Sequence, residues 1–193
     1  MTSEPAKPER GRLTTADWAE AALDLIAEQG VAAVAVEPLA RRLGVTKGSF
    51  YWHFPSRDAL LQAALERWES VEQQDVFGKL EAVADPRERL NVLFQLVAHE
   101  FKSHVVYSAL LKALDHPAVQ PVIERVSQRR LDYLTASFRQ TGLGRTEARH
   151  RARLTYAAYV GFLQLNLQLH QARMPQEEFE DYVAHLTRTL VPA

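Results

Sequence analysis

Residues 46–57, TKGSFYWHFPSR, carry a dense set of side chains that can donate hydrogen bonds. A lysine, a serine, a tyrosine and a histidine occupy alternate positions there: Lys47, Ser49, Tyr51 and His53. Such groups donate to phosphate oxygens, and a lysine can also reach the edge of a guanine. Residues 36–57 contain four Lys or Arg against one acidic residue, a local charge of +3, whereas the whole chain carries −1. The local pattern favours binding to nucleic acid, for which the overall charge gives no support.

Two arrangements that could support catalysis or metal binding are discounted. Ser49, His53 and Asp58 resemble a nucleophile, base and orienting acid, but Asp58 lies beyond a proline and no oxyanion site is evident. His99 and His104 are five residues apart, about 140° around a helix, so they do not converge on one ion. The chain has no cysteine, which excludes disulfides, thiolate zinc sites and cysteine catalysis. We therefore expect no enzyme activity, no catalytic residues, no metal and no cofactor.

The composition is that of an ordinary globular protein, with 47% apolar and 24% charged residues. No apolar run approaches the roughly 18 residues needed to span a bilayer, so we expect no membrane association. Residues 1–12 are charged and contain proline, without the apolar segment of a secretory signal, and are predicted to form a flexible arm. A cytoplasmic location fits these features best.

Apolar residues recur at helical spacing almost throughout, which predicts an all-α fold. The first helix should begin after Thr14, with Asp17 completing a capping box, and end at Gly30. The segment VAAVAV (31–36) could pass for a strand, but it has no plausible partner strand, and we interpret it as a link between helices. A short second helix over 37–43 should stop at Gly44, and Thr46 should cap a third.

The third helix must be short, because a residue that precedes proline is pushed away from helical angles. At 100° per residue, Phe50 and Phe54 share one face, which we expect to point inward. Trp52 lies on another side and is expected to pack against the first helix, with contact to DNA as the alternative. The polar side chains then lie outward on the second helix of a helix–Gly–helix pair, which has the form of a helix-turn-helix. The alternative is an ordinary pair of helices with a solvated polar face.

Further helices are predicted in the rest of the chain, with Ser56 as the cap of the first of them. They cover residues 57–77, 86–103, 105–114, 117–140, 146–171 and 175–190. The helix 146–171 is apolar on two sides, so both sides must be buried. One side can meet its own core and the other a second copy of the chain, although a core helix of a monomer is the alternative.

The sequence around the donors resembles the TetR (tetracycline-repressor-like) family of transcriptional regulators. The resemblance covers about residues 14–62 and rests on Gly30, VEPLARRLGVTKGSFYWHF and the following SRDALL. It implies a flexible arm (1–12), a three-helix helix-turn-helix domain (13–60) and a larger helical ligand-binding and dimerisation domain (61–193). Ala35 lacks the hydroxyl that usually caps the second helix and contacts a phosphate, and Glu37 stands where many members have arginine.

The resemblance also implies roles for individual residues. It implies that Lys47, Gly48 and Tyr51 contact bases. It also implies that Ser49, His53 and Arg57 contact phosphates. The backbone at Thr46 can offer N–H groups to a further phosphate. The predicted dimer interface consists of Leu154, Ala158, Gly161, Leu165, Leu169, Phe179, Val183 and Leu186. The candidate ligand-pocket residues, for which plain core packing is the alternative, are Trp68, Phe94, His99, Phe101, Tyr107, Leu111, Tyr133 and Asn166.

We therefore expect a homodimeric regulator that binds double-stranded operator DNA and is released by a small-molecule effector, most simply a repressor. In this family the effector tilts the fourth helix and moves the two DNA-reading heads out of register. The alternative from another class is a helical small-molecule-binding or interaction module that does not bind DNA.

Overall fold

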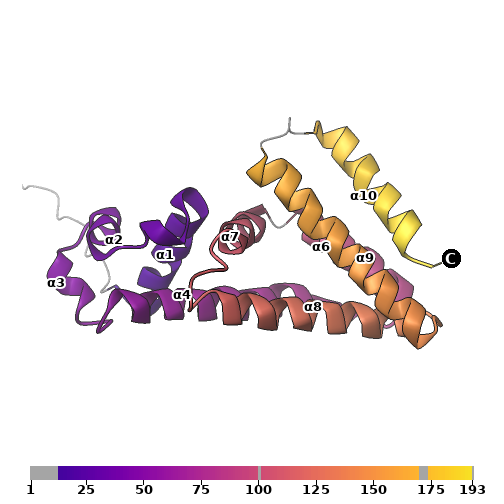
Figure 1. Ribbon diagram of the computed structural model, residues 1–193, viewed down its shortest axis with the longest axis horizontal. Coiled ribbons are helices and arrows are strands. Elements are labelled where there is room, and N and C mark those ends of the chain that lie inside the picture. The colour runs from indigo at the N-terminus through magenta and orange to yellow at the C-terminus, as the bar shows by residue number, and fades with distance from the viewer. Residues whose placement is uncertain (1–12, 100, 170–173, 193) are drawn as a thin grey trace, which may run out of the picture.

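The computed structural model describes residues 13–99, 101–169 and 174–192, and all regular structure within these ranges is helical. The all-α prediction is confirmed. Figure 1 shows an elongated molecule, with a small group of helices at one end and the C-terminal helix toward the other. The predicted arm, residues 1–12, lies outside the described residues.

The N-terminal head is built from short helices whose ends follow the local sequence. They are α1 (Thr15–Gln29), the one-turn 3-10 helix η1 (Val31–Ala33), α2 (Val36–Leu43), α3 (Lys47–Phe50) and α4 (Arg57–Glu72). The capping box at α1 is confirmed, since the backbone N–H of Asp17 donates to the Thr14 hydroxyl at 3.3 Å. Gly44 ends α2 with a φ of 68°, a left-handed conformation that favours glycine. Ser56 caps α4 as predicted, accepting from the backbone N–H of Ala59 at 3.1 Å.

The body contains the remaining helices. They are the π segment η2 (Gln73–Phe77), α5 (Gly78–Leu80), α6 (Pro86–His99), α7 (Phe101–Leu111), α8 (Gln120–Gln140), α9 (Arg145–Leu163), the π segment η3 (Gln164–Gln168) and α10 (Gln176–Leu190). The helices α4 and α9 each continue as a π-helical segment. The predicted boundary between helices at 103–105 is wrong. α7 begins earlier, at Phe101, and packs against α1, whereas α6 packs against α8 and α10.

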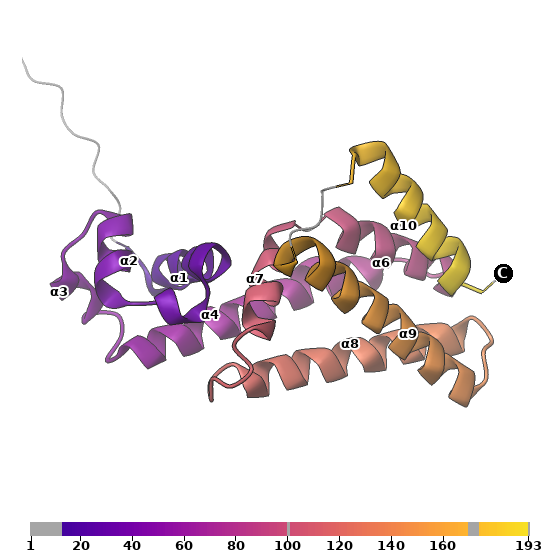
Figure 2. The ribbon, with the colours of Figure 1, turned by 45° about the horizontal axis from the view of Figure 1, so that its top comes forward.

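α8 and α9 form a hairpin that opens toward the head, and α7 lies between its arms (Figures 1 and 2). α4 runs from the head into the body and contacts α8. A second group of apolar residues closes the distal end between α6, α8 and α9: Leu80, Leu90, Leu93, Leu134, Phe138, Ala148 and Ala152. None of the helices in the described ranges is both long and apolar enough to cross a membrane.

One apolar core joins the head to the body. Trp18 of α1, Leu60 of α4 and Leu110 of α7 are fully buried and belong to the same cluster as residues of α8 and α9. Near this core, Lys102 of α7 pairs with Asp24 of α1 at 2.8 Å. The predicted domain boundary at residue 60 stays a prediction, because apolar packing is continuous across it.

Candidate nucleic-acid interface and ligand pocket

The short helix α3 is held from behind by aromatic packing. Phe50 is fully buried, with its ring edge-on to that of Trp18 at 5.4 Å and stacked on that of Phe54 at 5.7 Å. Both phenylalanines point inward, as the helical wheel predicted. Burial of two phenyl rings fixes the orientation of α3, so the opposite face of the helix is presented to solvent.

The predicted base-contacting residues lie on that opposite face. Lys47 and Gly48 are exposed, and the Tyr51 side chain is 58% exposed. A Cβ added to Gly48 would meet Thr46 Oγ1 at 3.7 Å, an ordinary van der Waals contact. Since Gly48 has no left-handed φ either, the fold itself does not require glycine at this position. Ser49 is half-buried, and the Thr46 hydroxyl makes no capping hydrogen bond to α3.

The prediction that Trp52 packs against the first helix is wrong, because its side chain is 83% exposed. The helix α3 ends at Phe50, and residues 51–53 form turns, so a spacing of 100° per residue does not extend to Trp52. The half-buried His53 takes the place beside α1, with its ring 6.3 Å from that of Trp18. The exposed aromatic surface of the head therefore consists of Tyr51 and Trp52.

The Arg57 guanidinium is already engaged within the head. Its Nε donates to the carbonyl oxygen of Val34 at 2.6 Å and its Nη2 to that of Val31 at 3.3 Å. Its Nη1 pairs with Asp58 at 3.2 Å. These bonds tie the link before α2 to the start of α4. The assignment of Arg57 to a phosphate stays a prediction, and a phosphate would have to compete with these partners.

Two departures from the family pattern lie at the start of α2. Ala35 occupies the N-cap position, where it supplies no side-chain hydrogen bond. Glu37 pairs with Arg41 one turn later at 3.7 Å, and both side chains are strongly exposed. Because the Glu37 carboxylate is paired with Arg41 on its own helix and both are exposed, we expect this ion pair to contribute little to stability.

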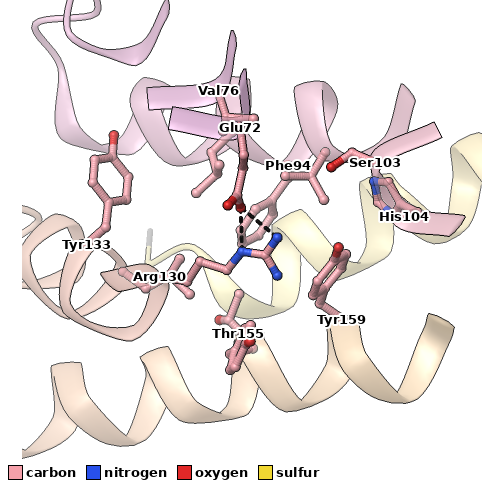
Figure 3. Close-up of a pocket in the computed structure, with 13 residues that line it drawn as sticks. Glu72, Val76, Phe94, Ser103, His104, Arg130, Tyr133, Thr155 and Tyr159 are labelled. Carbon is pink, nitrogen blue, oxygen red and sulfur yellow. Dashed lines mark hydrogen bonds and ion pairs between the residues drawn. The ribbon is translucent and has the colours of Figure 1, made fainter. Parts of the chain in front are cut away.

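The body contains two adjoining cavities that share Phe94, Val97, His104, Thr155 and Tyr159 as lining residues. The inner cavity has a volume of about 110 Å³ and ends at Glu72 of α4 and Arg130 of α8 (Figure 3). The outer cavity, of about 460 Å³, lies between α6, α9 and α10. Its lining is mostly apolar and includes Phe162, Leu163 and Leu190. Together they can accept a small molecule with one polar end.

Arg130 is the most constrained charge in the cavity. Its Nε donates to Glu72 Oε1 at 2.6 Å, and its guanidinium carbon lies 4.3 Å from the centre of the Tyr107 ring and 5.4 Å from that of Tyr159. Burial disfavours the charged form, but the nearby Tyr159 and Glu72 outweigh burial and hold the pKa of Arg130 above its ordinary value. Arg130 therefore carries a fixed positive charge.

Other polar groups around the cavity are neutral at neutral pH. Burial lowers the pKa of His104 to about 4, and its ring lies edge-on to that of Tyr159 at 5.3 Å. Burial also raises the pKa of Tyr159 to about 12. Behind them the hydroxyls of Tyr107 and Tyr156 hydrogen-bond to each other, and that of Tyr156 donates to Ser127 at 2.8 Å. The charge of the cavity is thus set by Arg130 and its carboxylate partners.

The structure distributes the predicted pocket residues between cavity and core. Phe94, His99, Tyr133 and Asn166 line one or both cavities. Trp68 and Tyr107 are buried in the core, where their rings stack at 5.9 Å, and Leu111 packs against the same core. The side chain of Phe101 lies outside the described residues. Sequence reasoning missed Glu72, Arg130 and Thr155, since no local spacing links residues of three different helices.

The predicted dimer residues separate into two groups. Leu154 and Leu169 of the α9–η3 segment are 59% and 62% exposed, and Leu165 is 43% exposed, so they form an apolar stripe on the surface of the protomer. The remaining residues include several that line the outer cavity of the same protomer: Ala158, Phe179, Val183 and Leu186. Their assignment to an interface between two copies stays a prediction.

A family model described as bacterial regulatory proteins, tetR family, matches residues 19–64, which include α2, α3 and most of α1. The segment of residues 19–64 belongs to the tetR family. The regulator AcrR of Shigella flexneri is 34% identical over 87 residues, which cover 45% of this chain and 39% of that relative. The match thus spans well under half of the length of this curated relative.

Solved structures extend the likeness to the body of the TetR-family fold. The reduced form of E. coli NemR has a TM-score of 0.76 at 19% identity, covering 94% of this chain and all of that one. AibR, solved in complex with isovaleryl coenzyme A and operator DNA, has a TM-score of 0.69 at 19% identity, covering 92% and 98% of the two chains. At these identities the likeness is one of fold. Glu72, Arg130 and Thr155 all lie beyond the matched residues 19–64, so the chemistry of the cavity must be argued from this chain.

Proposed function

We propose that the protein is a homodimeric transcriptional regulator that binds operator DNA through α3 and is released from it by a small-molecule effector. The observation that carries the proposal is the two-faced construction of α3. Phe50 fixes one face in the core, while Lys47 and Tyr51 project from the other. A rigid helix with exposed donors can enter the major groove and contact base edges.

The small size of this face is the argument for a dimer. One α3 can contact only a few base pairs, whereas two copies related by a two-fold axis read two half-sites about one helical turn apart. The exposed leucines of α9 and η3 supply an apolar surface for the second copy. We propose that this stripe forms the centre of the dimer interface.

The cavity supports a role for an effector. It lies against α4, which leads directly from the head, so a ligand that moves α4 would change the spacing of the two heads. Repression follows most simply, because an effector that spreads the heads would release the DNA. The alternative function, a ligand-binding or interaction module without DNA binding, would leave the exposed face of α3 without a partner.

The test begins with selection of bound fragments from random duplex DNA, followed by fluorescence anisotropy with the selected duplex. Lys47→Ala combined with Tyr51→Ala is expected to weaken binding by at least about tenfold, since each contact to a base or phosphate contributes on the order of 1 kcal/mol or more. Gly48→Ala should also weaken binding, although the fold accepts a methyl group there, because a Cβ would lie between the backbone and the bases.

The matched control is Lys79→Ala, which removes an exposed lysine from α5 in the body. It should retain full affinity, and all variants should keep their helical circular dichroism. For the unmodified protein the logarithm of affinity should fall with that of salt concentration, with a slope near −0.9 per phosphate contacted. Failure to select any duplex would support the module without DNA binding. Equal affinity in the Lys47→Ala/Tyr51→Ala variant would contradict the assignment of DNA binding to α3.

A further inference from the structure

Buried polar atoms without a hydrogen-bond partner face the inner cavity. One is the acceptor Glu72 Oε2, which lies 3.5 Å from Arg129 Nη2. Nη1 of Arg130 and Oγ1 of Thr155 make no hydrogen bond to any residue in the described part of the chain. In Figure 3 the Arg130 guanidinium lies between Glu72 on one side and Thr155 and Tyr159 on the other. A buried donor that stays unpaired costs free energy, so a ligand that supplies an acceptor at this point is favoured.

The charges behind the cavity favour an anion over a neutral acceptor. Three guanidiniums face two carboxylates across α4 and α8, which leaves one positive charge in excess: Arg125, Arg129 and Arg130 against Glu69 and Glu72. Burial opposes the ionised form of Glu69, but hydrogen bonds from Arg125 and Arg129 outweigh it, so its pKa is lowered. Because Glu69 is charged and His104 is neutral, these side chains together carry a net charge of +1 beside the cavity, which favours an anion there.

A cationic ligand is disfavoured by the same geometry. The aromatic faces that could hold a cation are already occupied, because the Arg130 guanidinium lies over the rings of Tyr107 and Tyr159. A second cation placed there would be repelled by Arg130. The end of the guanidinium away from Glu72 remains open to an acceptor.

The outer cavity determines the rest of the ligand. Its apolar lining combines aromatic and aliphatic side chains from α6, α9 and α10 with few polar groups, of which Asn166 is one. The Nδ2 of Asn166 donates to the carbonyl oxygen of Phe162 at 2.8 Å, so part of the hydrogen-bonding capacity of this side-chain amide is already used within the protein. A ligand with an apolar body and a single charged end therefore fits, with the charged end in the inner cavity and the apolar body in the outer one.

We propose that the effector is an amphipathic monocarboxylate. Its carboxylate accepts hydrogen bonds from Arg130 Nη1 and Thr155 Oγ1, and its apolar chain fills the outer cavity. This inference rests on the proposed function only in calling the ligand an effector. The carboxylate shares the guanidinium with Glu72 of α4, which weakens the ion pair between α4 and α8 and thereby connects the ligand to the helix that leads from the head.

The test compares three probes with the same alkyl chain in calorimetric titrations of the whole protein at neutral pH, without DNA. Decanoate is expected to bind at least about tenfold more tightly than 1-decanol, because charge-assisted hydrogen bonds are stronger than neutral ones. Decylamine should bind more weakly than either. Equal affinity of decanoate and 1-decanol, absence of decanoate binding, or preference for decylamine would overturn the proposal.

Three substitutions assign the effect to the site. Arg130→Met and Thr155→Val should reduce the preference for decanoate over 1-decanol, whereas Glu72→Gln should increase decanoate affinity by removing the competing carboxylate. The matched control is Arg139→Met, which removes an exposed guanidinium of α8 from a residue that lines neither cavity. An unchanged preference in Arg130→Met would overturn the assignment.

Arg130→Met leaves Glu72 as a buried carboxylate with a weaker partner, and the variant can fail to fold for that reason. The double variant Glu72→Gln/Arg130→Met removes both charges and should fold while lacking the preference for decanoate. Retention of that preference in the double variant would contradict the proposal. Because no DNA is present, failure of decanoate to bind leaves the DNA-binding function intact, and failure of DNA binding leaves the ligand result intact.

Discussion

At the scale of single residues, the head separates two aromatic side chains that are only two positions apart. Phe50 is fully buried against Trp18, and Trp52 is 83% exposed. The first holds the helix in place, while the second contributes nothing to the core. A change at each position should therefore act on a different property of the protein.

Phe50→Ala is expected to lower the free energy of unfolding by about 3–5 kcal/mol, the usual cost of a cavity left by a buried phenyl ring. Trp52→Ala should change the free energy of unfolding by less than about 0.5 kcal/mol, as exposed substitutions do. Urea denaturation followed by circular dichroism measures both. Similar losses in the two variants would contradict the inward and outward placement of these side chains.

His104 should make stability depend on pH. Its pKa is about 4 in the folded protein, because burial disfavours the imidazolium, against about 6.5 in an unfolded chain. Between these values the unfolded state binds more protons, so stability rises with pH. The free energy of unfolding should have its full value above about pH 6.5 and should decrease as the pH is lowered toward 4. In His104→Gln, urea denaturation across this range should show a smaller dependence on pH.

The matched control for the pH experiment is His150→Gln, which removes an exposed imidazole from α9. This variant should retain the pH dependence of the unmodified protein. If His104→Gln and His150→Gln behaved alike, burial of His104 would not be the source of the effect.

At the scale of elements, the head depends on helix ends rather than on helix length. α3 contains four residues and α2 eight, too few to be stable alone. Gly44 provides the left-handed end of α2, whose first turn lacks the side-chain cap that α1 and α4 both have. The start of α2, like that of α3, thus lacks a side-chain hydrogen bond to its first turn.

Ala35→Ser should stabilise the protein, because a serine hydroxyl at this N-cap can accept from a free N–H of the first turn. The expected gain in the free energy of unfolding is about 1 kcal/mol. Urea denaturation provides the measurement, with Ala32→Ser as a control at an exposed position of η1 that caps no α-helix. Equal effects of the two substitutions would show that capping is not the cause. By resemblance to the family, Ala35→Ser should also strengthen binding to the selected duplex.

At the scale of the whole molecule, the apolar surface of α9 and η3 is exposed on the protomer. The exposed leucines at 154, 165 and 169 form a stripe along one side of this segment, which is unusual for a side facing water. The predicted dimer residues of α10 instead line the outer cavity within the protomer. The dimer prediction is therefore best tested on the α9–η3 stripe.

Leu165→Glu should convert the dimer to a monomer, because a carboxylate placed in an apolar interface would be desolvated without a partner. Sedimentation velocity gives the oligomeric state directly. The control is Leu114→Glu, since Leu114 is exposed to a similar extent, 42% against 43%, and lies between α7 and α8. A dimer that survives Leu165→Glu, or a protein that is monomeric without any change, would contradict the predicted interface.

Much of the head could be predicted from the sequence because its determinants are local. Caps at Thr14 and Ser56, the glycine after α2 and the inward face of Phe50 all depend on residues within a few positions of one another. The prediction was wrong at Trp52, where the helix ends too early for a regular spacing to hold. The boundary between α6 and α7 was also misplaced, since their packing against different helices sets the break.

The sequence by itself determined the helical content, the motif and the face of α3 that carries the donors. Only the tertiary structure brought together Glu72, Arg130 and Thr155, which lie on three helices and are far apart in the chain. The apolar periodicity of a helix shows which of its sides is buried, but it does not show which other helix that side meets. The energy of a buried charge depends on its neighbours in space, so the chemistry of the cavity was decided by packing.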